Sequence, residues 1–181
     1  MDSNLSTPDV LCLGILVTDV LARPVERYPE RGKLVLVDRM EVHIGGCAAN
    51  TGIGLARLGV RTGVIGKGGR DGFGNFVIDT LQKQGVDTAG VARDETASTS
   101  ATMVLIHPDG ERSFIHQIGA NATLREEELN LDLLRDARLV HIAGAFLMPG
   151  FDGSAMARVL QRAKAQGLLT ALDTAWDSSG Q

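Results

Sequence analysis

The stretch Gly45-Gly46-Cys47-Ala48-Ala49-Asn50 lies between a run that alternates like a β-strand and a run that is apolar like a packed helix. Two adjacent glycines let a ligand approach the backbone closely. The Asn50 amide, one helical turn later, offers both donors and an acceptor. The same residues also suit a plain turn in which Asn50 bonds to nearby backbone. We predict that the stretch begins a helix and holds a small polar molecule.

Two strand patterns precede the double glycine. Residues 10–17 are continuously apolar, which is typical of a strand buried on both faces of a parallel sheet, and the run ends at Thr18-Asp19. Asp19 is there either a ligand contact or an acceptor for nearby backbone amides. Residues 34–44 alternate, except at Asp38, and predict a strand with one face in water. Residues 20–23 are a candidate neighbour for this second strand.

Helical and extended patterns alternate through the rest of the chain, apart from one hairpin. Its two extended segments, within residues 100–118, flank a turn at Pro108 and Gly110. Helices are predicted at about 49–58, 73–81, 126–134 and 153–166, and strands at 62–66, 139–142 and 168–173. The predicted fold class is α/β, with a mostly parallel core sheet, incomplete at the C-terminus, and a small separate β-sheet. A separate sheet of this kind suits a site that must exclude water.

Composition and charge limit the classes of function. The chain has 181 residues, 44% of them hydrophobic, and its 18 basic and 22 acidic residues give a net charge of -4. No basic run suggests nucleic-acid binding, and no apolar stretch reaches the length of a membrane span. The polar segment from Met1 to Asp9 lacks the pattern of an export signal, so we expect a cytoplasmic protein.

Several chemically reactive residue types occur without a recognisable site pattern. Cys12 and Cys47 are predicted to be packing residues, and the four histidines lack the spacing of metal ligands. Residues 66–72 are rich in glycine but contain neither a P-loop nor a dinucleotide-binding pattern. We interpret them as a loop between a strand and a helix, with Asp71 near the start of the helix.

Six stretches, in order and at matching spacing, resemble the PfkB carbohydrate kinases, the ribokinase-like sugar and nucleoside kinases. They are Gly14 to Asp19, Gly45 to Asn50, Ile65 to Gly74, Gly85 to Thr88, Asp109 to Arg112 and Leu172 to Asp177. The resemblance covers nearly the whole chain and implies a Rossmann-like three-layer core with a β-sheet lid. It makes residues 1–181 the N-terminal part of a single kinase domain, with the lid at about 18–44 and 100–118 and the core at about 9–17, 45–99 and 119–181.

The resemblance also implies a reaction, the transfer of the γ-phosphoryl group of ATP to a hydroxyl of a sugar or nucleoside. By their places in the family's motifs, Asp19 and Asn50 would hold substrate hydroxyls, and Gly45 and Gly46 would lie against the substrate. Asn121, where the lid rejoins the core, is a further candidate for the substrate site. The expected partner is a small polyhydroxy molecule, and the lid is expected to serve as a homodimer surface too. The sequence does not select among hexose, pentose and nucleoside.

The chain departs from the family in one respect. A Gly-Ala-Gly-Asp-type segment, which carries the general base and the anion hole in family members, does not occur in the 181 residues. We therefore assign no catalytic residue here and expect the general base beyond Gln181. ATP, Mg²⁺ and, in some members, a monovalent cation are expected for the complete enzyme, but no residue of this chain is assigned to them. The chain alone is expected to be inactive and, because the strand at 168–173 lacks neighbours, less stable or soluble.

Two other classes of function stay open. A non-catalytic module of the same fold would bind a metabolite or a protein partner through its open cleft or its lid surface. A nicotinamide-dependent enzyme would need a phosphate-binding fingerprint that the chain lacks. Asp173, at the end of a predicted core strand, lies where open α/β sheets contact ligands, or it caps the following turn.

Overall fold

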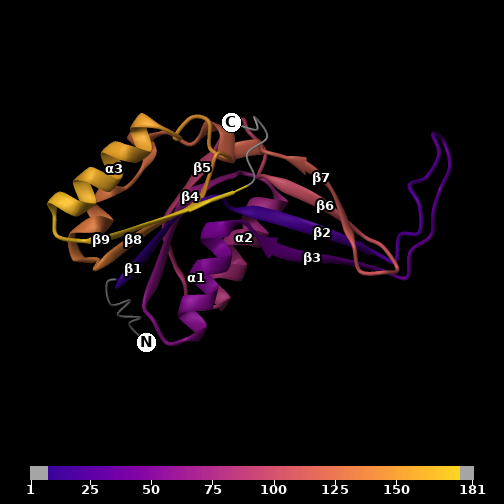
Figure 1. Ribbon diagram of the computed structural model, residues 1–181, viewed down its shortest axis with the longest axis horizontal. Coiled ribbons are helices and arrows are strands. Elements are labelled where there is room, and N and C mark those ends of the chain that lie inside the picture. Colours follow the sequence, from indigo (N-terminus) through magenta and orange to yellow (C-terminus); the bar gives the residue numbers. More distant parts are fainter. Residues whose placement is uncertain (1–7, 176–181) are drawn as a thin grey trace.

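The computed structural model describes residues 8–175, which form two β-sheets with flanking helices (Figure 1). Within these residues, a five-stranded sheet of order β5-β4-β1-β8-β9 is parallel throughout, and a four-stranded sheet of order β3-β2-β6-β7 is mixed. The strands are β1 (Val10–Gly14), β2 (Val17–Arg23), β3 (Arg39–Gly45), β4 (Thr62–Gly69), β5 (Asp87–Asp94), β6 (Ala101–Ile106), β7 (Arg112–Gln117), β8 (Leu139–Ala145) and β9 (Leu169–Thr174). The α-helices are α1 (Cys47–Arg57), α2 (Gly72–Lys83) and α3 (Ser154–Ala165), and the 3-10 helices are η1 (Gly119–Thr123), η2 (Glu126–Glu128) and η3 (Leu131–Asp136).

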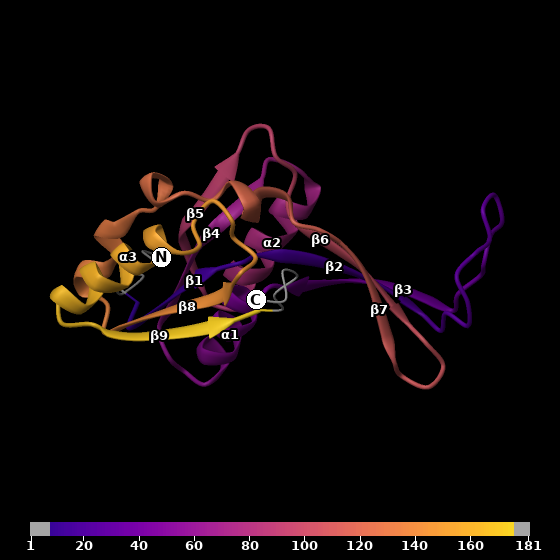
Figure 2. The same cartoon turned by 45° about the horizontal axis from the view of Figure 1, so that its top comes forward.

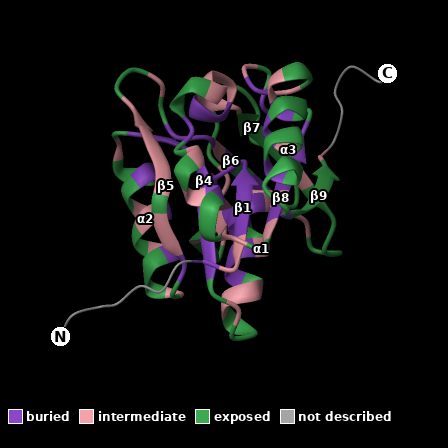
Figure 3. Ribbon diagram, turned by 90° about the vertical axis from the view of Figure 1, so that its left-hand side faces the viewer, coloured by how far each residue is buried: buried purple, intermediate pink, exposed green. Residues whose placement is uncertain are grey.

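Two hydrophobic clusters cover opposite faces of the five-stranded sheet. Leu11 and Leu13 of β1 pack in a cluster with α3 and the 3-10 helices, whereas Cys12 packs in a cluster with α1 and α2. Because both faces need apolar partners, β1 is apolar on both faces and shows no alternation. Figure 3 shows the buried residues concentrated in β1, β4 and β8, in the middle of the sheet. The predicted α/β core is confirmed.

The four-stranded sheet extends away from the helical layers, and the chain between its strands β2 and β3 projects beyond it (Figures 1 and 2). β2 pairs antiparallel with β3 and parallel with β6, and β6 and β7 form the predicted hairpin. Two backbone hydrogen bonds between His107 and Glu111 and between Gly110 and His107 close its turn. Residues 20–23 join this sheet as part of β2, as the sequence suggested.

The prediction of one strand over residues 10–17 is wrong. β1 ends at Gly14, and the chain crosses through Ile15 and Leu16 into β2, which belongs to the other sheet. A Cβ at Gly14 would lie 1.9 Å from the carbonyl oxygen of Ala143, so only glycine lets the chain pass this close to β8. The hydrophobic pattern does not mark the crossing because the crossing residues are themselves buried.

The strand predicted from residue 34 begins later, at Arg39. Arg39 pairs with Arg23, the last residue of β2, and Pro24 follows, which has no N–H to continue the ladder. Residues 34–38 therefore have no strand to pair with. Leu34 and Leu36, predicted to lie on the apolar face of the strand, are 77% and 85% exposed.

The remaining differences concern β4, β5 and the segment before β8. β4 runs to Gly69, so most of the predicted glycine-rich loop is buried strand, and a Cβ at Gly69 would lie 2.5 Å from the carbonyl oxygen of Ala97. β5 was not predicted, because this edge strand carries one large apolar side chain, Val91. Residues 126–134 form 3-10 turns instead of the predicted α-helix, since the backbone is extended at Leu129. The other predicted helices and strands are confirmed within a few residues at their ends.

Candidate functional site

The carboxyl ends of β1 and β8 lie side by side, where the strand order of the five-stranded sheet reverses. From β1 the order runs to β4 and β5 on one side and to β8 and β9 on the other. Ligands of open α/β sheets bind in the crevice outside such a switch point. The segments around Ile15, Gly46 and Gly144 approach one another closely there, and glycine at two of these positions leaves room for the approach. A Cβ at Gly46 would lie 2.4 Å from the carbonyl oxygen of Ile15, and a Cβ at Gly144 would lie 2.6 Å from the Ile15 side chain.

Asp19 and Gly45, two of the predicted site residues, lie against each other. Asp19 lies on β2, and Gly45 ends the neighbouring strand β3. A Cβ at Gly45 would be 2.1 Å from Oδ2 of Asp19 and 2.7 Å from its Cγ. The carboxylate therefore occupies the space that a side chain at position 45 would fill. Asp19 is half-buried.

Gly46 and Asn50 are placed by the start of α1. Gly46 is the residue before the helix and has a φ of 93°, a conformation that favours glycine. Asn50 is exposed, and its backbone N–H donates to the Gly46 carbonyl oxygen at 2.9 Å. Its side chain lines a hollow of about 290 Å³ together with residues of β3, α1 and α2 (Ile44, Ile53, Gly54, Arg57, Thr80 and Gln84). The structure thus brings Asp19, Gly45 and Gly46 together and places Asn50 beside them, on a groove toward α2.

Asn121 lies in η1 and is 2% exposed. Its Oδ1 accepts a hydrogen bond from the N–H of Leu16 at 3.2 Å, and its Nδ2 donates to the carbonyl oxygen of Leu16 at 3.0 Å. Leu16 lies in the crossing between β1 and β2, three residues before Asp19. Asn121 therefore binds the backbone that leads into the candidate site, a role that the sequence did not predict.

A row of polar side chains crosses the four-stranded sheet on the face that carries Asp19. Asp19 pairs with His43 of β3 and with Thr102 of β6, and Thr102 pairs with His116 of β7. Register partners point to the same face of a sheet. Thr102 is 9% exposed, and its Oγ1 lies 3.0 Å from Nδ1 of His116. Local spacing in the sequence does not reveal this row, because it depends on the strand register that aligns the four residues.

Asp71 caps α2 and is committed to that role. One of its oxygens accepts from the Gly74 N–H and the Thr99 hydroxyl, and the other accepts from the Thr99 N–H, each at 2.7 Å. Burial alone would raise the pKa of Asp71, but the hydrogen bonds from Thr99 and Gly74 outweigh burial and lower it. The predicted place of Asp71 at the start of a helix is confirmed.

The two thiols do not have the environment of a nucleophile. Burial raises the pKa of the Cys12 thiol to about 12. Burial, and secondly the negative charge of Asp173, raises the pKa of Cys47. Trp176 and Asp177, the last residues of the sixth family-like stretch, lie outside the described residues, as do residues 1–7 of the polar N-terminal segment.

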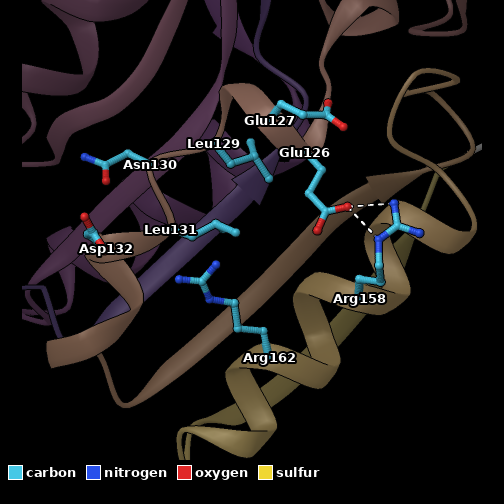
Figure 4. A pocket seen from close by; sticks show the side chains of 8 residues that line it. All are labelled: Glu126, Glu127, Leu129, Asn130, Leu131, Asp132, Arg158 and Arg162. Carbon is cyan, nitrogen blue, oxygen red and sulfur yellow. Dashed lines mark hydrogen bonds and ion pairs between the residues drawn. The ribbon is translucent and has the colours of Figure 1, made fainter.

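Another hollow lies far from Asp19, Gly45 and Gly46 in the fold and includes none of them. Its volume is about 550 Å³, and it lies between η2, η3 and α3, where Glu126 pairs with Arg158 and Arg162 reaches toward Leu131 (Figure 4). In the part of the chain from 8 to 175, no group of three or more His, Cys, Asp or Glu side chains is arranged to hold a metal ion. Over the same residues, no helix is both long and apolar enough to span a membrane.

Comparison with known proteins identifies the relatives of this architecture. The model of the pfkB family of carbohydrate kinases matches residues 7–181. The chain belongs to this family. Among curated relatives, probable fructokinase-3 of Arabidopsis thaliana is 38% identical over 131 residues, which are 71% of this chain and 38% of that protein. The putative sugar kinase PH1459 of Pyrococcus horikoshii is 28% identical over 166 residues, which are 92% of this chain and 52% of that protein.

Solved structures of pfkB-type kinases share the fold. Fructokinase from Xylella fastidiosa with bound ATP aligns with a TM-score of 0.77 and 29% identity, over 94% of this chain and 49% of that chain. Arabidopsis thaliana ribokinase complexed with ribose and ATP aligns with a TM-score of 0.80 and 23% identity, over 93% of this chain and 54% of that chain. The chain has the ribokinase-like fold and spans about two fifths to half of the length of these relatives.

Proposed function

We propose that this chain is the substrate-binding and lid portion of an ATP-dependent kinase that phosphorylates a hydroxyl of a sugar or nucleoside. The observation that carries the proposal is the Asp19 carboxylate, which lies against Gly45 beside the switch point of the sheet. A carboxylate accepts hydrogen bonds from hydroxyl groups, and the Asn50 amide can both donate and accept. The names of the fructokinase and ribokinase relatives support a sugar as the acceptor.

The four-stranded sheet would be the lid, and its polar row would face the acceptor. Thr102 and His116 lie on the same face as Asp19, so they would add a hydroxyl and an imidazole to the groups that read the substrate. Asn121 would act by holding Leu16, because both polar atoms of its side chain bind the Leu16 backbone. Closing such a sheet over the site would exclude water from the reacting groups.

ATP is the expected phosphoryl donor, since fructokinase and ribokinase relatives hold it in their structures. The family resemblance assigns the groups that bind ATP, Mg²⁺ and a monovalent cation, and the general base, to sequence outside these 181 residues. The sequence contains neither a P-loop nor a dinucleotide-binding pattern. We therefore derive no step of phosphoryl transfer from this chain.

The 181-residue chain by itself is accordingly proposed to lack significant kinase activity. Phosphoryl transfer depends on positioning and charge stabilisation, and a general base alone contributes about 10²–10⁴-fold. Incubating the purified chain with ATP and a panel of sugars and nucleosides should give no ADP above a control without protein. Substrate-dependent ADP formation would refute this part of the proposal.

Binding of the acceptor tests the main proposal. Calorimetric titration of the chain with D-fructose, D-ribose and adenosine should detect at least one ligand, and Asp19→Ala should weaken its binding. Asp9→Ala is the matched control, because Asp9 pairs with Arg61 at the opposite, amino end of the sheet. Equal loss of affinity in both variants would point to general destabilisation and count against a ligand role for Asp19.

The lid sheet is also proposed to form a homodimer through the face opposite Asp19. Large apolar side chains on that face are exposed, namely Met40 at 62%, Val42 at 48%, Met103 at 44% and Ile115 at 57%. Exposed apolar patches of this kind mark interaction surfaces.

A cytoplasmic location stays a prediction.

The second candidate function is a non-catalytic module of the same fold that binds a metabolite or a protein. The exposed apolar face of the lid is the observation that favours it. Reading the coding frame beyond Gln181 separates the two, because a Gly-Ala-Gly-Asp-type segment there would support the kinase.

A further inference from the structure

Lys67 is a charged residue buried in the middle of the fold. It lies on β4, is 4% exposed, and its Nζ is 2.8 Å from Oδ2 of Asp94, 2.6 Å from Oε1 of Glu128 and 3.2 Å from the carbonyl oxygen of Thr123. The three protons of an ammonium group thus have three acceptors. Burial disfavours the charge, but the hydrogen bonds and charges of Asp94 and Glu128 outweigh burial and raise the pKa of Lys67.

Asp94, one of the two carboxylate partners of Lys67, also accepts hydrogen bonds on both of its oxygens. Its Oδ1 accepts from the backbone N–H groups of Ala97 at 2.8 Å and Thr96 at 2.9 Å, and its Oδ2 accepts from the Thr123 hydroxyl at 2.7 Å. The N–H of Ala97, and next the Lys67 ammonium, hold the pKa of Asp94 far below its usual range. The pair therefore stays charged, and both members hold Thr123, one through its carbonyl oxygen and one through its hydroxyl.

Thr123 connects this cluster to the candidate site. It is the last residue of η1, the same short helix that carries Asn121. Asn121 in turn holds both the N–H and the carbonyl oxygen of Leu16, in the crossing that leads from β1 to Asp19 on β2. Hydrogen bonds thus tie η1 at Thr123 to a buried ion pair in the core sheet and at Asn121 to the Leu16 backbone, and the backbone of η1 joins the two residues.

We infer that Lys67 is a positioning residue, which fixes η1 through Thr123 and Asp94 and thereby sets the position of Asp19 and of the lid relative to the core. The inference rests on the proposed function for its effect on the substrate, and the cluster itself does not touch the site. A buried ion pair is costly to desolvate and is often no more stabilising than apolar side chains of similar size. This pair makes directional hydrogen bonds to Thr123 of η1. Apolar side chains in the same place could not make such bonds and would fix η1 less firmly.

The first experiment measures the anchor directly, without a ligand. Thr123→Val removes the hydroxyl bond to Asp94 and nearly keeps the shape of the side chain, while Thr123→Ser retains the hydroxyl. Amide hydrogen exchange of Leu16 should be about tenfold faster in Thr123→Val than in Thr123→Ser. The amide of Cys12, in the middle of β1, should exchange alike in both. Equal exchange of Leu16 in the two variants would overturn the inference.

The second experiment measures the consequence for binding. The Kd for D-fructose or D-ribose, whichever the unmodified chain binds, should rise about tenfold in Thr123→Val and recover in Thr123→Ser. Lys67→Met should speed the exchange of Leu16 at least as much. If that variant does not fold, the comparison of Thr123→Val with Thr123→Ser still tests the inference. If the unmodified chain binds neither these sugars nor adenosine, the proposed acceptor class is wrong, but the exchange of Leu16 still tests the anchor. Faster exchange with unchanged affinity would overturn the part of the inference that concerns Asp19.

Discussion

Replacing Gly45 with alanine should move the Asp19 carboxylate and leave the fold intact. The new Cβ would lie 2.1 Å from Oδ2 and 2.7 Å from Cγ of Asp19, distances that real atoms do not adopt. The clash is with the end of a side chain, so Asp19 can turn to another rotamer while the backbone stays in place. Gly45→Ala is therefore expected to remove the carboxylate from the site.

The two effects of this substitution differ in size. A rotamer forced out of its preferred angle costs about 0.5–1.5 kcal/mol, and replacing glycine with alanine stabilises by about 0.4–1 kcal/mol through the unfolded chain. The net change in the free energy of unfolding should therefore be close to zero. A hydrogen bond to a charged group contributes about 1.5–3 kcal/mol, and each 1.4 kcal/mol corresponds to about tenfold in affinity. Sugar binding should thus weaken by about 10-fold to about 150-fold.

Calorimetric titration with the sugar, together with urea unfolding, would measure both quantities. Gly72→Ala is the control, because Gly72 begins α2, does not line the hollow of Asn50, and a Cβ there would meet nothing within 4 Å. It should stabilise the chain by about 0.5–1 kcal/mol without changing the affinity. The reasoning would be refuted if Gly45→Ala bound sugar as tightly as the unmodified chain, or if it lost affinity only in proportion to a loss of stability.

Three further outcomes are expected. Asp19→Ala and Asn50→Ala should each weaken sugar binding by about 0.5–3 kcal/mol, and calorimetry that shows unchanged affinity in both would remove them from the site. Met103→Glu, on the exposed apolar face of the lid, should shift the chain toward monomer in sedimentation equilibrium, whereas an unaltered mass would argue against that dimer surface. The folded-state pKa of Asp94 lies below its ordinary value of 3.8, so its contribution to stability is present above that pH and is lost as the pH falls. As the pH is lowered below about 4, the free energy of unfolding measured with urea should therefore decrease less in Asp94→Asn than in the unmodified chain. Equal decreases in the two proteins would contradict this.

Sequence patterns predicted most of the elements, and their failures have physical causes. The continuous run at residues 10–17 indicates burial on both sides, but Ile15 and Leu16 are buried at a crossing between two sheets, where apolarity does not distinguish strand from connection. β5 escaped prediction because an edge strand needs few large apolar side chains. The 3-10 helices at 119–136 are held by contacts to distant residues, such as the bonds from Lys67 to Thr123 and Glu128.

The sequence by itself determined the family, the alternation of strands and helices, and the glycines and carboxylate of the candidate site. These features are local, since each depends on which residue types occur at short spacing. Only the tertiary structure decided that Asp19 fills the space beside Gly45, that Thr102 and His116 share its face, and that Asn121 binds backbone. The register of β1 and β8 pairs Val10 with Leu139, and the hydrogen bonds of Asn121 reach Leu16, 105 positions away; such pairings arise from the packing of the whole chain.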